Sequence, residues 1–483
     1  MIRLYLDWNI LNQMKNGYFS DLYNILKFDN RFIIFYSTAH IDDIFASYSE
    51  KKEQQVVINA DLQFISDFSK NNCILKTKES AVYFDIISPH KLFENRIESE
   101  EIIKNFSIDN LAKSFDNTEF KELAEQAINL LKYIPININL TNALNDSQTS
   151  KYLNILFPNL NENPNFGDLI NSFMEMVKKM NNDTAYDDLR KIFQNGLNIN
   201  RDKIFDSKNP FDDLVKLLYP ISNNGIDGLQ EKINEIRNIN VLNWFDTFAN
   251  TYINLDIAGF QEDKIGKNKN KKQTFKNTMQ DAFHSAFASA CDIYILNDKR
   301  GYRKSIETYK HFNINTKVFK PYEFIEYYNK CLNINNGNQF LNLIITHLKE
   351  TKPFITPNNN GDGYFRVYPS SFYFFNFFNK IYVIDYKNEN DSENKIVILL
   401  SKDKPTNGKF TLFKEIKNLI ENLNNYFGQD YDSLGSLKFE EFENLDKWQG
   451  RYWILDKFSL RLVQINGYFQ LYIDIYDEKS QNI

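Results

Sequence analysis

Four aspartates in this sequence stand where a carboxylate could take part in metal chemistry; they are Asp7, Asp43, Asp281 and Asp298. Asp7 and Asp298 each follow a short apolar run typical of a buried strand, and the other two lie on stretches with helical spacing. Because open parallel sheets bind ligands beyond the carboxyl ends of their strands, we expect the four to converge in one cleft. Gathered carboxylates repel one another unless a cation neutralises them. The set therefore predicts a site for Mg²⁺ or Mn²⁺, which prefer oxygen ligands.

Two histidines accompany these acids at helical spacing. His284 lies one turn after Asp281, so it shares a helix face with that acid and could assist proton transfer. His40 stands three residues before Asp43 in the same relation. We expect His284 to be catalytic and His40 to support the site. The neighbouring Asp42 remains an alternative to Asp43 as the acid on this helix.

A lysine-rich stretch directly precedes Asp281 in a chain whose formal net charge is −6. That net charge excludes a polybasic molecule as a whole, so attraction to phosphate has to come from a local patch. We expect nucleic-acid contacts from Lys267, Lys269, Lys271, Lys272 and Lys276. Such contacts are made to the phosphate backbone and carry no sequence specificity.

The elements that must position these residues begin as an α/β alternation. Residues 2–6 and 32–36 are continuous apolar runs, as expected for parallel strands covered on both faces. Helical spacing over residues 11–28 predicts a helix between them. A further helix is expected over residues 53–68, followed by a strand at 73–75. This part of the chain therefore predicts a strand, acid, helix order typical of a parallel sheet.

The alternation stops near residue 93 and returns about 150 residues later. A helix at 278–291 runs into a strand at 293–296, and a second strand at 316–319 precedes a helix that starts near Tyr322. Between the two parts we find amphipathic stretches punctuated by prolines, which indicate a helical insertion. Beyond residue 335, β-rich runs and one amphipathic helix indicate an α+β domain. The aromatic run at 372–378 is expected to fill a core.

The predicted fold class is α/β, with a parallel sheet flanked by helices, a large helical insertion and a C-terminal α+β domain. The predicted organisation is residues 1–92 and 245–334 for the two parts of the α/β domain, 93–244 for the insertion and 335–483 for the C-terminal domain.

In their order along the chain, these blocks resemble a PIN domain, the fold of a family of nucleases. The matching segments are Leu4–Asn9, Ser37–Asp43, Asp281–His284, Cys291–Asp298 and Val318–Phe324. The family pattern has an Asp-x-Asn after the first strand, an acid on the next helix, an Asp on a later helix and an Asp at the end of a strand. The resemblance implies metal ligation by the four aspartates, with Asn9 in a supporting position. Asp292 is expected at the end of the late helix or in a supporting position of the site rather than as a direct ligand.

The activity implied by the resemblance is hydrolysis of a phosphodiester by a metal-activated water. RNA is the expected substrate, so the protein would be a metal-dependent endoribonuclease, in the setting of a bacterial toxin or an antiviral defence effector. The insertion and the C-terminal domain would restrict or trigger access to the site, with a protein activator or inhibitor as a further partner. The sequence names neither the RNA nor the trigger nor the oligomeric state.

Two other functions stay open. A degenerate PIN-like protein could bind RNA or a protein without cutting, because Leu296 stands where the family often has a hydroxyl and the second acid is a short Asp. A third option is hydrolysis of a small phosphate ester at the same site.

Length and composition limit the number of domains and the class of protein to be expected. The chain has 483 residues, of which 42% are hydrophobic and 25% charged, as in folded proteins with more than one domain. Its three cysteines lack metal-ligand spacing and suggest neither a disulfide framework nor structural zinc. We find no signal peptide and no membrane-spanning run, so a cytoplasmic protein without a membrane partner is expected.

Overall fold

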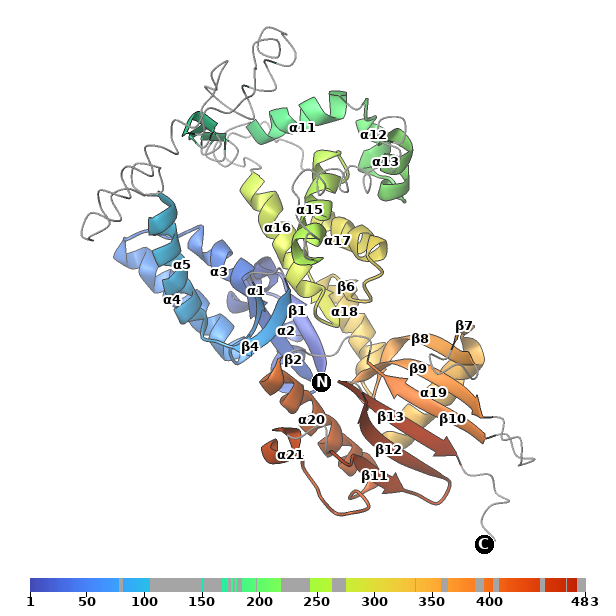
Figure 1. Ribbon diagram of the computed structural model, residues 1–483. Helices are drawn as coiled ribbons and strands as arrows, with labels where there is room; N and C mark the ends of the chain where they lie inside the picture. The colour runs from blue at the N-terminus through green and yellow to red at the C-terminus, as the bar shows by residue number, and fades with distance from the viewer. Residues whose placement is uncertain are drawn as a thin grey trace, which may run out of the picture.

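The computed structural model shows two sheets, each with its own helices (Figure 1). It describes residues 1–77, 81–104, 185–196, 198–218, 244–262, 275–334, 336–357, 364–386, 395–402, 408–443, 448–465 and 467–475, together with scattered residues between 150 and 179.

The first sheet joins segments from both parts of the predicted α/β domain. Its strands are β1 (Ile2–Leu6), β2 (Phe32–Ser37), β3 (Asn72–Lys76), β4 (Val82–Ile86), β5 (Ile293–Ile295) and β6 (Lys317–Phe319). Their order is β4-β3-β2-β1-β5-β6, and every neighbouring pair is parallel except β3 with β4. β1 lies between β2 and β5, pairing Leu4 with Ile34 on one side and with Ile293 on the other. The α/β prediction is therefore confirmed at the level of a mixed, mainly parallel sheet.

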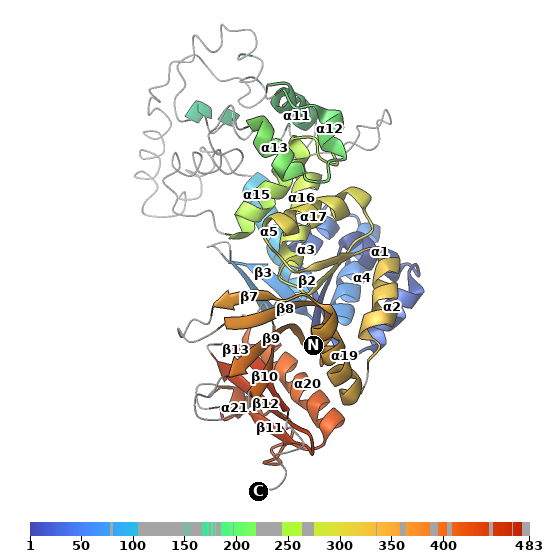
Figure 2. The same ribbon diagram turned by 90° about the vertical axis from the view of Figure 1, so that its right-hand side faces the viewer.

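Helices cover both faces of this sheet. One face carries α1 (Trp8–Lys15), α2 (Ser20–Phe28), α3 (Thr38–Phe45), α4 (Lys52–Ser69), α5 (Pro89–Lys104) and α18 (Pro321–Tyr327), which continues into a π-helical turn, η1 (Tyr328–Leu332). The other carries α15 (Trp244–Ile257), α16 (Phe275–Ala288) and α17 (Lys299–His311). Figure 2 shows α1, α2 and α4 together on one side of the domain.

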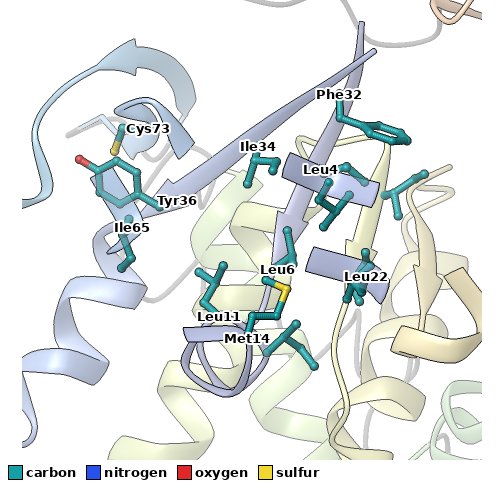
Figure 3. Close-up of a cluster of buried hydrophobic side chains, with 14 of the residues drawn as sticks. Leu4, Leu6, Leu11, Met14, Leu22, Phe32, Ile34, Tyr36, Ile65 and Cys73 are labelled. Carbon is teal, nitrogen blue, oxygen red and sulfur yellow. The ribbon is translucent and has the colours of Figure 1, made fainter. Parts of the chain in front are cut away.

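Alternation along the strands explains why two separate cores form. Successive side chains of a strand point to opposite faces, so Leu4 and Leu6 enter one core and Tyr5 enters the other. Figure 3 shows the first core, in which Leu6 lies near Leu11 and Met14 of α1 and Leu4 lies farther along the strand toward Phe32. Full burial of one such leucine contributes roughly 1.5–3 kcal/mol to folding. Because both faces are covered, the strands read in the sequence as continuous apolar runs.

Three helices of the insertion pack beyond the carboxyl-terminal end of α15. They are α11 (Ala185–Gly196), α12 (Arg201–Phe205) and α13 (Pro210–Leu218). Their apolar side chains form a small core with Leu255 and Phe260, and Figure 1 shows them at the end of the molecule farthest from the second sheet. Other parts of the predicted insertion, including the amphipathic stretches at residues 111–133 and 229–236, lie outside the described residues.

The second sheet is antiparallel and has the order β11-β12-β13-β10-β9-β8-β7. Its elements are α19 (Gly337–Glu350), β7 (Phe354–Pro357), β8 (Tyr364–Phe374), β9 (Phe378–Tyr386), β10 (Lys395–Ser401), α20 (Lys409–Phe427), α21 (Phe439–Glu443), β11 (Arg451–Ile454), β12 (Phe458–Ile465) and β13 (Tyr468–Ile475). The three helices contribute to the same hydrophobic core as the strands. The run at 372–378 comprises the end of β8, the turn at residues 375–377 and the first residue of β9. Phe374, Phe375, Phe377 and Phe378 are buried there, so the core role predicted for this run is confirmed.

Two sequence expectations about the first sheet were wrong. The helical spacing over residues 11–28 is split into α1 and α2, because Gly17 at φ 84° and Phe19 at φ 53° have left-handed backbone that ends one helix and starts the next. β4 was not expected at all. Its side chains are mostly half-buried, so Val82–Ile86 lacks the continuous apolar pattern of the central strands.

A buried group of charges joins the first sheet to the C-terminal domain. Nζ of Lys402 lies 3.1 Å from Asp292 and 3.2 Å from Glu415 of α20, and Nε of Arg3 lies 3.5 Å from each of the two acids. Asp292 also accepts a hydrogen bond from the backbone N–H of Arg3 at 2.7 Å. These four side chains are at most 5% exposed. Asp292 precedes β5, so it lies at the amino edge of the sheet, and its expected supporting role in the acidic site is wrong.

None of the helices in the described part of the chain combines the length and the apolar character that crossing a membrane requires.

Candidate functional site

Two of the predicted acids follow adjacent strands. Asp7 comes directly after β1 and Asp298 shortly after β5, and the backbone N–H of Asp7 donates to Ile295 at 2.9 Å. Both carboxylates cap helices: Asp7 accepts from the backbone of Asn9 at 3.3 Å and Asp298 from that of Gly301. An Asp at this position satisfies N–H groups that the helix itself leaves open. Both acids therefore face the carboxyl edge of the parallel strands.

Asn9 holds the first of these acids in place. Its side-chain amide donates to Oδ2 of Asp7 at 3.1 Å, the same oxygen that the backbone N–H of Asn9 reaches. Asp7 is 7% exposed, whereas Asp298 is an exposed residue. These contacts place Asn9 beside Asp7, and its role in supporting a metal site stays a prediction.

Asp43, rather than Asp42, points toward the other predicted residues. Its Oδ2 lies 2.7 Å from Nε2 of His284, which joins α3 to α16. Asp42 turns away and accepts from Nε of Arg96 on α5 at 2.6 Å. The geometry thus separates two neighbouring acids that the sequence left as alternatives.

Tyr5 connects the histidines from within the sheet. Its phenol oxygen lies 2.8 Å from Nδ1 of His284, 2.6 Å from Oγ of Ser37 and 3.3 Å from Nδ1 of His40. The side chain is fully buried between β1 and the helices. Neither Tyr5 nor Ser37 was predicted as a site residue, because a tyrosine inside an apolar strand gives no local signal of a polar role.

His40 is a structural residue of this network. Its Nδ1 accepts from the backbone N–H of Ser37 at 3.1 Å, and its Nε2 therefore carries the proton that it donates to the Leu6 carbonyl at 2.8 Å. Burial, together with the charge of His284, holds the pKa of His40 well below its usual value. A neutral ring in this position caps α3 and fixes the backbone immediately before Asp7.

Burial and neighbouring carboxylates raise the pKa of two acids at this edge, Asp7 and Asp281. Burial raises the pKa of Asp7, and the negative charge of Asp43 raises it further, while His284 and Asn9 act in the opposite direction. Burial also raises the pKa of Asp281 well above its usual value, with Asp7 and Asp298 adding to the shift. The predicted acids therefore lie near enough to influence one another. We refer to Asp7, Asp43, Asp281 and Asp298 as the acidic edge.

His284 supplies positive charge next to the acidic edge. Burial opposes protonation of its ring, but Asp43 first, followed by Asp7 and Asp281, outweighs burial and raises the pKa of His284 to about 9. The ring is an imidazolium at neutral pH. Its two nitrogens are both engaged, Nε2 with Asp43 and Nδ1 with Tyr5.

Lys304 is a second cation near the site that sequence reasoning missed. It lies on α17, is 1% exposed, and donates to Asp256 at 2.8 Å. Asp256 also accepts from Tyr186 at 2.9 Å and from Arg190 at 3.3 Å, both on α11. The charge of Lys304 lowers the pKa of Asp281, in opposition to burial. The network connects the insertion to the acidic edge.

The donor types at the acidic edge fit a hard divalent cation, since all four side chains offer carboxylate oxygens. Burial first, and neighbouring carboxylates after it, raise the pKa of Asp7 and Asp281. Among the residues described here, however, no three His, Cys, Asp or Glu side chains stand close enough together to hold a metal ion. Coordination by the full set therefore requires side-chain movement from this arrangement.

Of the five lysines expected to contact nucleic acid, the structure describes one. Lys276 is a half-buried residue in the first turn of α16. Lys267, Lys269, Lys271 and Lys272 lie outside the described residues. Their predicted contact with nucleic acid stays a prediction.

Comparison of the chain with protein-family models, with curated proteins and with solved structures finds no match.

Proposed function

We propose that this protein is a metal-dependent phosphodiesterase of the PIN-like kind that cleaves RNA. The observation that supports the proposal is the acidic edge: Asp7 and Asp298 follow adjacent parallel strands, Asp43 and Asp281 lie on α3 and α16, and neighbouring carboxylates raise the pKa of Asp7 and Asp281. RNA as the substrate rests on the resemblance of the sequence blocks to PIN domains.

In this proposal the four aspartates hold Mg²⁺ or Mn²⁺, and a bound cation supplies an activated water and neutralises charge on the scissile phosphate. Asn9 orients the Asp7 carboxylate, and His284 orients that of Asp43. Lys304 and the His284 ring counter the repulsion among the acids.

We assign His284 a positioning role in place of the proton transfer expected from the sequence. A general acid or base needs a ring nitrogen that can reach the reacting group. Nε2 of His284 is bonded to Asp43 and Nδ1 to Tyr5. With both nitrogens engaged, the ring fixes the carboxylate and balances its charge.

Binding of RNA without cleavage is the second candidate. It is favoured by one observation: across the described residues no three potential ligands stand within reach of one ion. Hydrolysis of a small phosphate ester is the third function left open by the sequence. It differs from the first two in that the protein would act on the small ester and not on RNA.

The test is cleavage of a mixture of structured and unstructured RNAs by the full chain, in Mn²⁺ and in EDTA. Asp43→Asn is compared with Asp42→Asn, a matched control because Asp42 pairs with Arg96 away from the acidic edge. A second variant, Asp7→Asn/Asp281→Asn, removes two acids without changing side-chain size, and its folding is checked by urea unfolding.

Metal-dependent cleavage that survives in Asp42→Asn and disappears in the other two variants supports the proposal. Cleavage that is unchanged in Asp7→Asn/Asp281→Asn contradicts it. RNA binding without cleavage in Mn²⁺ selects the binding protein, and hydrolysis of a nitrophenyl phosphodiester without any action on RNA selects the small-molecule enzyme.

A further inference from the structure

A cavity of about 860 Å³ lies at the amino edge of the first sheet, away from the acidic edge. Phe32 and Asn72, which begin β2 and β3, form part of its wall. Helices α2 and α4 of the first domain line it, and so does α20 of the C-terminal domain, which packs beside β4 (Figure 1). The volume is in the range of sites for small organic ligands, about 300–1,000 Å³. The cavity therefore brings both domains into contact with any molecule that it holds.

One wall of the cavity is aromatic. The rings of Tyr23, Phe64 and Phe68 are nearly parallel, with centroids 5.6 Å apart for both pairs that include Phe68 and 6.4 Å apart for the third pair. All three side chains are only half-buried. A planar heteroaromatic ring can extend such a stack, because every base presents a π face to an aromatic side chain.

The remaining wall carries positive charge from both domains. Its lysines are Lys27, Lys70, Lys414 and Lys417. The ammonium of Lys414 donates to the side-chain carbonyl of Asn72, a neutral acceptor, at 3.3 Å. Burial lowers the pKa of Lys414, and the charge of Lys70 lowers it further. An anion placed between these two lysines would relieve their repulsion.

Three acids also line the cavity, and each has a partner. Asp29 accepts from Nε of Arg31 at 2.8 Å, Asp67 from Gln63 at 2.8 Å and Glu421 from Ser436 at 2.8 Å. Glu421 also lies 4.0 Å from Lys417. Because Asp29 is matched by Arg31, the four lysines outweigh the acids that remain, and the cavity favours an anionic ligand.

We propose that this cavity binds a nucleotide, with the base against Tyr23, Phe64 and Phe68 and the phosphate between Lys70 and Lys414. The aromatic wall by itself would accept any flat apolar molecule, and the lysines any anion. A phosphorylated heteroaromatic compound uses both walls at once. Since the lysines come from two domains, the bound nucleotide would tie the C-terminal domain to the first sheet. This site is separate from the acidic edge and does not depend on the function proposed for it.

The test is calorimetric titration of the full chain with AMP and UMP in EDTA, beside inorganic phosphate and adenosine. We expect saturable binding of at least one of the two nucleotides, and binding of phosphate and adenosine that is weaker by about tenfold or more, because each uses one wall only. Lys414→Gln and Phe68→Leu should each weaken nucleotide binding by about tenfold. Lys409→Gln on the same helix should leave it unchanged, since Lys409 pairs with Glu443 outside the cavity.

Thermal unfolding of each variant without ligand shows that it is folded before it is titrated. Phosphate that binds as tightly as the nucleotides would overturn the proposal, and so would nucleotide binding that Lys414→Gln leaves intact. Nucleotide binding lost in Asp281→Asn would place the ligand at the acidic edge and would likewise overturn it. The proposal would also be overturned if neither AMP nor UMP bound saturably.

Discussion

Nε2 of His284 lies 2.7 Å from Oδ2 of Asp43, which ties α16 to α3 across a gap of 241 residues in the sequence. On the opposite side of the same ring, Nδ1 meets the Tyr5 hydroxyl at 2.8 Å. The position of one carboxylate at the acidic edge thus depends on a histidine and a tyrosine from two other elements. Partners of this kind determine how well a carboxylate is oriented toward a metal.

Replacement of His284 by Asn should lower metal-dependent RNA cleavage by about 10- to 100-fold, because Asp43 loses the donor that orients it. Initial rates at saturating Mn²⁺ measure the effect. Asp42→Asn serves as the control and should cleave at nearly the rate of the unaltered protein. Equal rates for His284→Asn and the unaltered protein would show that the ring does not position Asp43.

Tyr5→Phe should lower the free energy of unfolding by about 1–3 kcal/mol, because the change leaves the Ser37 hydroxyl and Nδ1 of His284 buried without this partner. Urea unfolding measures the loss. Tyr18→Phe is the matched control, since Tyr18 is 67% exposed, and should be neutral. A loss no larger than that of the control would mean that the hydroxyl contributes nothing to the network.

Lys304→Met should destabilise the fold by about 3–5 kcal/mol, because it removes a cation from the fully buried Asp256. Lys310→Met on the same helix breaks only an exposed pair with Glu307 and should cost less than about 1 kcal/mol. The comparison is made by urea unfolding at neutral pH. Similar losses for both variants would contradict the structural role of the Asp256 network.

Acid should weaken the junction between the first sheet and the C-terminal domain. Burial opposes ionisation of Asp292, but Lys402 and Arg3 outweigh it and lower the pKa of Asp292 from 3.8 to about 2. A lowered carboxylate pKa stabilises the folded state above the unfolded value and loses this effect as the pH falls through the folded value. Asp292 should therefore contribute roughly 2 kcal/mol that disappears between about pH 4 and pH 2.

Unfolding by urea across this pH range tests the contribution. In Asp292→Asn the side chain no longer titrates, so the dependence of stability on pH should become shallower even though the variant is less stable throughout. An unchanged slope would mean that Asp292 has the same pKa in the folded and unfolded chain.

The parts of the fold that the sequence predicted are those in which a pattern is set locally. β1, β2 and β5 are continuous apolar runs because helices cover both faces, and α4 has a regular amphipathic spacing. β4 was missed because its side chains are mostly half-buried and its alternation is weak. The break between α1 and α2 was missed because it depends on two residues with left-handed backbone conformation, Gly17 and Phe19. The apolar spacing of the sequence continues across them.

The site residues also differ in whether a local sequence pattern could predict them. Asp7 and Asp298 follow strands, so their placement at one edge follows from parallel pairing. Tyr5 and Lys304 could not be predicted, since their partners lie on elements far away in the sequence. The sequence analysis assigned Asp292 to the acidic site, although its position before β5 already indicated the opposite edge of the sheet. An acid that precedes a parallel strand lies at the edge opposite to one that follows it.

The most direct measurement for the acidic edge is Mn²⁺ binding by the full chain, followed by electron paramagnetic resonance. Saturable binding is predicted for the unaltered protein and for Asp42→Asn, with an affinity lower by about tenfold or more in Asp7→Asn and in Asp281→Asn. Mn²⁺ that binds equally to all four proteins, or to none of them, would contradict a metal site built from these carboxylates.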